Sequence, residues 1–187
     1  MVIRFENVTK SFDHKVIDDL SFEIKNGQRF AIFGRSGVGK TTLINLILGL
    51  EKANSGDIYK GFSKASVIFQ EDRLIDEISA VDNLKIIKDN PSLIKDTLRA
   101  LNIEDLKTPM SKFSGGMRRR VAIARALIFD GDILIMDEPF AGIDDENKNV
   151  AIDLIKEKFA EKTIIVVSHN KDDMAKFDIP LENVLYL

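Results

Sequence analysis

The segment "GRSGVGKTT", residues 34–42, constrains the fold of this chain more than any other part of the sequence. It matches the pattern G-x-x-x-x-G-K-[ST]. It follows an alternating run that predicts a strand and leads into "KTTLINLILGL", whose apolar residues recur at helical spacing. In such a strand–loop–helix unit, glycines let consecutive backbone N–H groups face phosphate oxygens, and the helix dipole adds to the attraction. The segment therefore predicts a phosphate-binding loop.

The alternative for this segment is a glycine-rich turn without a ligand. A chance match to the pattern in a chain of 187 residues is on the order of one in a hundred at ordinary glycine usage, so the turn is the weaker interpretation. We expect Lys40 to reach the β- and γ-phosphates and the Thr41 hydroxyl to bind Mg²⁺. The predicted loop consists of Gly34, Arg35, Ser36, Gly37, Val38, Gly39, Lys40, Thr41 and Thr42.

A pair of carboxylates follows the apolar run "ILIM". Asp137 and Glu138 stand at the carboxyl end of this predicted buried strand, where open α/β sheets bind ligands. We expect Asp137 to hold the metal through water and Glu138 to act as general base for the attacking water. Alone, such a pair is typical of a strand end that faces solvent. Together with the phosphate-binding loop, the functional interpretation is favoured.

The rest of the chain predicts an α/β fold. The first thirty residues alternate as strands do, and Asn26-Gly27 between two alternating runs predicts a hairpin, so an antiparallel sheet is expected to open the fold. The runs "DILIMDE" at 132–138 and "TIIVVSH" at 163–169 are typical of strands buried on both faces. Buried strands that alternate with helices indicate a parallel sheet.

Residues 71–113 differ from the predicted strands around them in the spacing of their apolar residues. Both "VDNLKIIKD" and "PSLIKDTLRAL" have helical spacing, and Asn90 with Pro91 forms a helix start. We interpret 71–113 as a helical subdomain inserted into one domain that spans residues 1–187.

Composition limits the classes of partner. The chain has 27 basic and 30 acidic residues, so no global field draws it to nucleic acid. Arg118 to Arg120 are interpreted as a solvated or phosphate-facing surface rather than a nucleic-acid site. Cysteine is absent, which fits a reducing cytosol. No apolar run approaches the roughly 20 residues of a membrane-spanning helix, and we expect a soluble, cytoplasmic protein.

A second anion-binding helix start, "FSGGM" at 113–117, precedes "RRRVAIARAL". With "GRSGVGKTT" and "ILIMDE" in this order, the chain resembles the ATP-binding cassette (ABC) ATPases over nearly its whole length. The resemblance implies a P-loop NTPase core with an N-terminal antiparallel subdomain and a helical subdomain. It also implies that Ser114, Gly115 and Gly116 cap the γ-phosphate held by an opposite subunit, so that two cassettes work head to tail.

The resemblance implies roles for four further residues. Gln70 in "VIFQEDRLI" matches the glutamine that contacts magnesium and the attacking water, and His169 in "VVSHN" matches the histidine that contacts the γ-phosphate. Asp144 in "FAGID" resembles an aspartate that contacts the partner subunit, and Phe12 in "TKSF" would stack on adenine. Without the resemblance, Gln70 would be a strand-end glutamine, His169 a structural histidine and Phe12 a core phenylalanine.

The predicted function is therefore an ATPase subunit that drives a membrane permease, with ATP and Mg²⁺ as cofactors. We expect a homodimer or a pair with a second ABC subunit, held at the inner face of the cell membrane by the permease, with no nucleic acid. Met117, where the family usually has glutamine, and "FQEDRLI" resemble the nitrate, sulfonate and taurine importers. The alternatives are an ABC ATPase of DNA maintenance or translation, a small P-loop kinase or GTPase, and a cassette that binds nucleotide without efficient hydrolysis.

Overall fold

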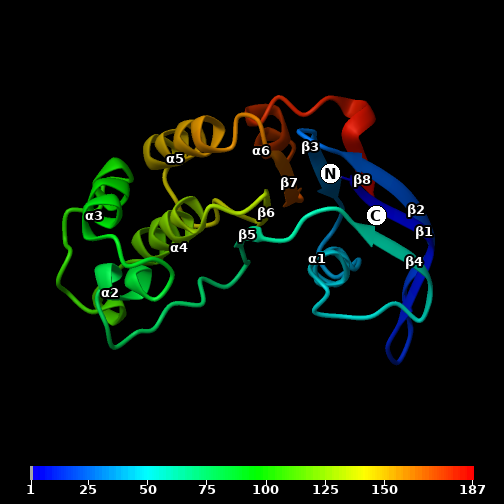
Figure 1. The fold of residues 1–187 in the computed structure, drawn as a ribbon, viewed down its shortest axis with the longest axis horizontal. Coiled ribbons are helices and arrows are strands. Elements are labelled where there is room, and N and C mark those ends of the chain that lie inside the picture. The colour runs from blue at the N-terminus through cyan, green and yellow to red at the C-terminus, as the bar shows by residue number, and fades with distance from the viewer. Residues whose placement is uncertain (1) are drawn as a thin grey trace.

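The computed structural model describes residues 2–187 and contains two β-sheets (Figure 1). The three-stranded sheet is antiparallel with the order β2-β1-β4, and the five-stranded sheet is parallel with the order β5-β6-β7-β3-β8. The strands of the first sheet are β1 (Val2–Ser11), β2 (Lys15–Lys25) and β4 (Ser55–Lys60). Those of the second are β3 (Arg29–Phe33), β5 (Ala65–Ile68), β6 (Ile133–Asp137), β7 (Thr163–Ser168) and β8 (Val184–Tyr186). The α/β class and the antiparallel opening of the fold are confirmed.

The hairpin predicted at Asn26-Gly27 is wrong. Gly27 does adopt a turn conformation, with φ of 73°, but β2 and β3 belong to different sheets. The turn passes the chain from one sheet to the other, and the Gly27 N–H donates to the Thr163 hydroxyl of β7 at 2.9 Å. β3 is apolar and buried on both faces at its centre, which suits an inner parallel strand rather than half of a hairpin. The actual hairpin joins β1 to β2, where Ser11 pairs with Lys15.

Both predicted buried strands are confirmed, because every residue of β6 and of β7 is buried. Successive residues point to opposite faces of the sheet. Ile133 and Ile135 join the apolar cluster that also contains α1 (Lys40–Leu48) and the antiparallel sheet. Leu134 and Met136 join the cluster that contains the remaining helices. The parallel sheet therefore separates two layers of core and carries residues of both.

The larger layer consists of helices. α4 (Gly115–Phe129) and α5 (Asp145–Lys158) cover one face of the parallel sheet, and α6 (Lys171–Lys176) follows β7. Beyond α4 lie α2 (Ala80–Lys85), α3 (Pro91–Ala100) and the short 3-10 helix η1 (Met110–Lys112), at the opposite end of the molecule from the antiparallel sheet (Figure 1). A second 3-10 helix, η2 (Leu181–Asn183), precedes β8.

The helix start predicted at Asn90 and Pro91 is confirmed. The Asn90 side chain accepts from the Leu93 N–H at 3.1 Å, and Pro91 is the first helical residue. The helix expected over "VDNLKIIKD" is shorter than its pattern, because α2 ends at Lys85 and the Ile86 side chain is exposed. Over residues 2–187, none of the helices combines the length and the apolar character needed to cross a membrane.

Candidate functional site

A cavity of about 700 Å³ opens where the phosphate-binding loop meets the carboxyl ends of the parallel strands. It is lined by predicted residues from five separate parts of the chain, together with Val16 and His14, for which no role was predicted. The predicted residues that line it are Phe12, Arg35, Ser36, Gly37, Gly39, Lys40, Thr41, Thr42, Gln70, Asp137, Glu138 and His169. Gly34 and Val38 belong to the same loop but do not line the cavity.

The phosphate-binding loop ends at Gly39, the residue that precedes α1. Gly39 has a φ of 110°, and a Cβ there would lie 2.8 Å from the Val16 side chain, so only glycine fits. Lys40 is 9% exposed, and its ammonium donates to the Gly34 and Arg35 carbonyl oxygens at 2.9 and 3.0 Å. Because an ammonium has three protons, one donor is left for a phosphate oxygen.

Asp137 and Thr41 lie together in the cavity. The Thr41 hydroxyl donates to Asp137 Oδ2 at 3.2 Å. Burial raises the pKa of Asp137; the bond from Thr41 opposes this shift, and the charge of Glu138 adds to it. A buried carboxylate next to a hydroxyl fits Mg²⁺, which takes oxygen ligands and is usually held by one or two protein groups together with phosphate and water. The donor set therefore suits the predicted magnesium ion.

Glu138 and His169 form a close pair at the cavity wall. Glu138 Oε1 lies 2.7 Å from His169 Nδ1 and accepts from the His169 backbone N–H at 3.1 Å. Glu138 has a left-handed backbone conformation, with φ of 47°, and its N–H donates to the Val167 carbonyl at 2.9 Å. The carboxylate is thus held at the end of β6 beside β7. Its side chain is 17% exposed and that of His169 is 69% exposed, so water reaches both.

Ser168 supports this pair, and sequence reasoning missed it. Its hydroxyl lies 2.9 Å from Asp173 Oδ2 and 3.4 Å from Glu138 Oε2, and it accepts from the Asn170 N–H at 3.0 Å. The only signal in the sequence was its place at the end of an apolar run, next to His169.

Phe12 and Gln70 both line the cavity. The Phe12 ring is 55% exposed, and the Lys10 ammonium lies 4.7 Å from its centroid. The core alternative for Phe12 is therefore wrong, and the ring is accessible for stacking on a base. Gln70 is exposed, while its backbone carbonyl accepts from Arg119 at 3.2 Å.

The "FSGGM" segment begins α4 and lies outside the cavity of its own chain. Ser114 is the N-cap, and its hydroxyl accepts from the Met117 N–H at 3.3 Å. A Cβ on Gly115 would meet no atom of the described residues within 4 Å, whereas one on Gly116 would lie 2.7 Å from the Gly142 carbonyl oxygen. Ser114, Gly115 and Gly116 therefore form an exposed helix start that packs on the loop before α5.

Asp144 also lies outside the cavity and caps α5. Its carboxylate accepts from the Asn147 backbone N–H at 3.0 Å and from the Asn147 side chain at 2.8 Å, and these bonds lower its pKa. A local structural role therefore accounts for its conformation in the single chain.

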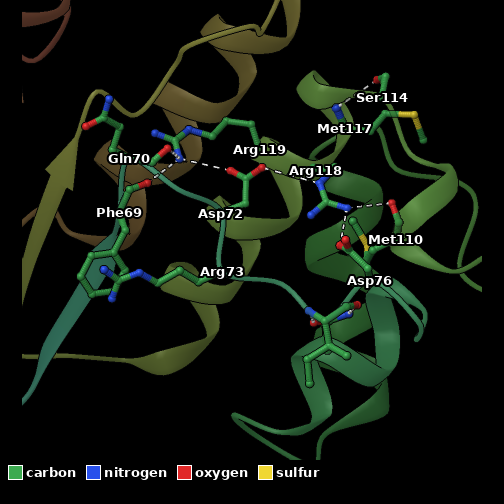
Figure 2. A network of polar contacts seen from close by, with 12 residues as sticks. Phe69, Gln70, Asp72, Arg73, Asp76, Met110, Ser114, Met117, Arg118 and Arg119 are labelled. Carbon is green, nitrogen blue, oxygen red and sulfur yellow. Dashed lines mark hydrogen bonds and ion pairs between the residues drawn. The ribbon is translucent and has the colours of Figure 1, made fainter.

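The interpretation of Arg118 to Arg120 as a solvated or phosphate-facing surface is wrong. The Arg119 side chain is 3% exposed and donates to the backbone carbonyls of Phe69, Gln70, Asp137, Glu138 and Pro139. Figure 2 shows its contacts on the side of Phe69 and Asp72. Arg118 pairs with Asp76, and Arg120 donates to the Leu101 and Asn102 carbonyls. The triplet fixes α4 to its neighbours.

Comparison with known proteins points to one family. A family model described as ABC transporter matches residues 17–141. The chain is 37% identical, over 94% of its length and 73% of the relative, to the energy-coupling factor transporter ATP-binding protein EcfA2 of Clostridium tetani. It is 30% identical to the thiamine import ATP-binding protein ThiQ of Photorhabdus laumondii, over 94% of this chain and 83% of that one. Other relatives are named for import and for export.

Solved structures give the same result. The dimeric structure of MJ0796, described as a bacterial ABC transporter cassette, superposes with a TM-score of 0.85. The match covers 99% of this chain and 94% of that chain at 25% sequence identity.

Proposed function

The chain belongs to the ABC transporter family, and from this premise we propose that it is an ATP-binding and ATP-hydrolysing subunit that energises a membrane transporter. The observation that carries the proposal is the convergence of Lys40, Thr41, Asp137, Glu138 and His169 on one cavity. Hydrolysis of a nucleoside triphosphate needs a cationic donor, a metal site and a base within reach of the γ-phosphate, and this cavity supplies all three.

The cofactors in this proposal are ATP and Mg²⁺. Phe12 stacks on the base, and the loop of residues 34–42 and the Lys40 ammonium bind the phosphates. Thr41, Asp137 and Gln70 hold the magnesium ion, directly or through water. When bound, the ion neutralises negative charge on the β- and γ-phosphates.

Glu138 and His169, the pair at the cavity wall, carry out hydrolysis in this proposal. The Glu138 carboxylate accepts a proton as a water oxygen attacks the γ-phosphorus, and the bond between that phosphorus and the ADP oxygen breaks. Gln70 orients this water. The exposed His169 imidazole turns from Glu138 to the γ-phosphate oxygens and stabilises their charge in the transition state.

The dimer in this proposal explains why the chain has two anion-binding helix starts. Ser114, Gly115 and Gly116 lie outside their own cavity and are exposed, or in part exposed, on α4. We propose that they close over the γ-phosphate bound by a second cassette, identical or homologous, while Asp144 contacts that partner. ATP then closes the dimer, and hydrolysis reopens it.

The permease and the direction of transport form the last part of the proposal. Residues 71–113 form a helical subdomain that transmits dimer closure to a transmembrane permease, which holds the protein at the cytoplasmic face of the membrane. We propose import, and the nitrate, sulfonate and taurine class of solute, on the resemblance carried by Met117 and "FQEDRLI".

The test of the ATPase and the dimer uses Glu138→Gln. The variant keeps the size and most contacts of the side chain but loses the base, so turnover is expected to stop while ATP still binds. Size-exclusion chromatography with light scattering should then show a dimer that forms only with ATP. Monomers at saturating ATP would refute the dimer, and hydrolysis of GTP but not ATP by the wild type would refute ATP as the substrate.

The test of the transport role is affinity purification from native membranes. We expect a transmembrane permease to co-purify, and a solute-binding protein as well if the system imports. Recovery of ribosomes or DNA repair proteins in place of a permease would favour the non-transport alternative.

A further inference from the structure

Arg119 is a charged residue that the proposed mechanism does not use, although it lies at the centre of the site's framework. Its side chain is 3% exposed, and burial of a guanidinium is costly unless each donor finds an acceptor. Its hydrogen-bond acceptors are backbone carbonyls and one carboxylate, from two segments far apart in the chain. Such a residue fixes the two segments relative to each other.

The first segment carries Gln70. Arg119 Nη1 donates to the Phe69 carbonyl, to the Gln70 carbonyl at 3.2 Å and to Asp72 Oδ1 at 3.2 Å (Figure 2). Arg119 Nη1 therefore fixes the backbone of the segment that carries the Gln70 side chain.

The second segment carries Asp137 and Glu138. Arg119 Nη2 donates to the Asp137 carbonyl at 3.0 Å and to the Glu138 carbonyl, and Nε donates to the Pro139 carbonyl at 2.9 Å. Glu138 has a left-handed backbone, which is unfavourable for a residue other than glycine, so this conformation needs external support. The bond from Arg119 to the Glu138 carbonyl is part of that support.

We propose that Arg119 is a positioning residue for ATP hydrolysis. By binding the backbone carbonyls of Gln70 and Glu138, it fixes the position of the Glu138 carboxylate relative to the Gln70 side chain. A guanidinium is planar and its donors have fixed directions, so it transmits displacement of one segment to the other. This inference rests on the proposed ATPase function and adds a role that depends on neither contact with nucleotide nor contact with metal.

The same guanidinium connects the site to the helical end of the molecule. Asp72 Oδ2 lies 3.9 Å from Arg118 Nε, and Arg118 Nη1 contacts Asp76 Oδ1 at 2.7 Å and the Met110 carbonyl at 3.1 Å. Figure 2 shows this series of contacts between Arg119 and the turn before Ser114. A displacement of residues 72–76 would therefore shift the Glu138 backbone through Arg119.

The test compares Arg119→Met, which keeps the length of the side chain without its donors, with Arg119→Lys, which restores a charge but only a compact ammonium. For Arg119→Met we expect kcat to fall by about 10- to 100-fold, since misplacement of a catalytic group on the order of 1 Å costs about 10²-fold. The dissociation constant for ATP should not change, because Arg119 does not line the cavity. Arg119→Lys should recover part of kcat.

The matched control is Arg29→Gln. Arg29 at the start of β3 also donates to a backbone carbonyl, that of Phe177 at 3.1 Å, and to Asp178 Oδ2 at 3.1 Å, but contacts neither Gln70 nor Glu138. We expect a lower melting temperature and an unchanged kcat. If Arg119→Met does not fold, Arg119→Lys and Asp72→Asn decide, and both should show reduced kcat with unchanged ATP affinity.

A double-mutant cycle with Glu138→Gln separates positioning from general structural support. In single-turnover assays, which can follow the slow residual hydrolysis left when the base is lost, Arg119→Met should slow hydrolysis in the wild-type background much more than in the Glu138→Gln background. Equal factors in both backgrounds, or a folded Arg119→Met with normal kcat, would overturn the inference. A wild type without ATPase activity would instead overturn the proposed function.

Discussion

Gly115 and Gly116 are adjacent at the start of α4, yet the structure predicts opposite effects for the same substitution. A Cβ on Gly116 would lie 2.7 Å from the Gly142 carbonyl oxygen, about 0.7 Å closer than ordinary van der Waals contact permits, and both groups are backbone. Relief requires a shift between α4 and the loop before α5, and overpacking of this kind costs about 1–3 kcal/mol. We therefore expect Gly116→Ala to destabilise the protein by this amount.

Gly115→Ala is the internal control, because its Cβ would meet no atom of the described chain within 4 Å. Both variants share the gain in helix propensity, so the difference between them reports the contact with Gly142. At this chain length 1 kcal/mol shifts the melting temperature by about 2–4 °C, so Gly116→Ala should melt about 2–12 °C below Gly115→Ala.

The assay is thermal unfolding followed by circular dichroism, without nucleotide, together with ATP-dependent dimer formation. Gly115→Ala should melt slightly above the wild type because of its higher helix propensity. It should form less dimer, because the added methyl group enlarges the helix start that we propose closes over the partner's nucleotide. Equal melting temperatures for the two variants would refute the steric argument. A normal dimer in Gly115→Ala would refute its place in the interface.

Two further predictions concern single side chains. Phe12→Ala should weaken ATP binding by about 1–3 kcal/mol, the range for aromatic–base stacking, and calorimetric titration measures this loss. The melting temperature should stay constant, because Phe12 is 55% exposed. As a control, Phe12→Tyr should bind ATP normally. The pKa of Asp132 is lowered by hydrogen bonds from the Lys64 and Ser63 N–H groups and the Ser63 hydroxyl, so its ionised form stabilises the fold above its ordinary pKa, and that stability is lost as pH falls through the lowered value. Asp132→Asn should therefore be less stable than the wild type at pH 7 and equally stable in acid, and a gap in denaturation midpoint that persists in acid would contradict this.

The features that could be predicted from sequence are those that depend on local backbone chemistry. The junction of loop and helix at Gly39 and Lys40, the cap at Asn90 and the helix start at Ser114 each require particular residue types at fixed spacing, and all three form where expected. The strands β6 and β7 were predictable because apolar runs this short, bounded by polar residues, favour a strand covered on both faces over a helix.

The features that could not be predicted depend on contacts between distant segments. Asn26-Gly27 specifies a turn, but not which strand will pair with the next one, and burial of β3 on both faces decided this. Three consecutive arginines point in three directions around a helix, so the sequence alone does not show that Arg119 faces inward. The roles predicted for Ser114, Gly115, Gly116 and Asp144 depend on a second subunit and stay predictions.

The parallel sheet, whose residues alternate between two layers of core, also determines how the protein opens. Ile164 and Val166 of β7 pack in one layer, and Ile165 and Val167 pack in the other. Loosening of either layer leaves the strand anchored by the opposite one, so its amide protons stay protected until both layers separate. In native-state hydrogen exchange, the amides of β6 and β7 should therefore exchange last, with the free energy of global unfolding, while those of α2 and α3 exchange through smaller openings.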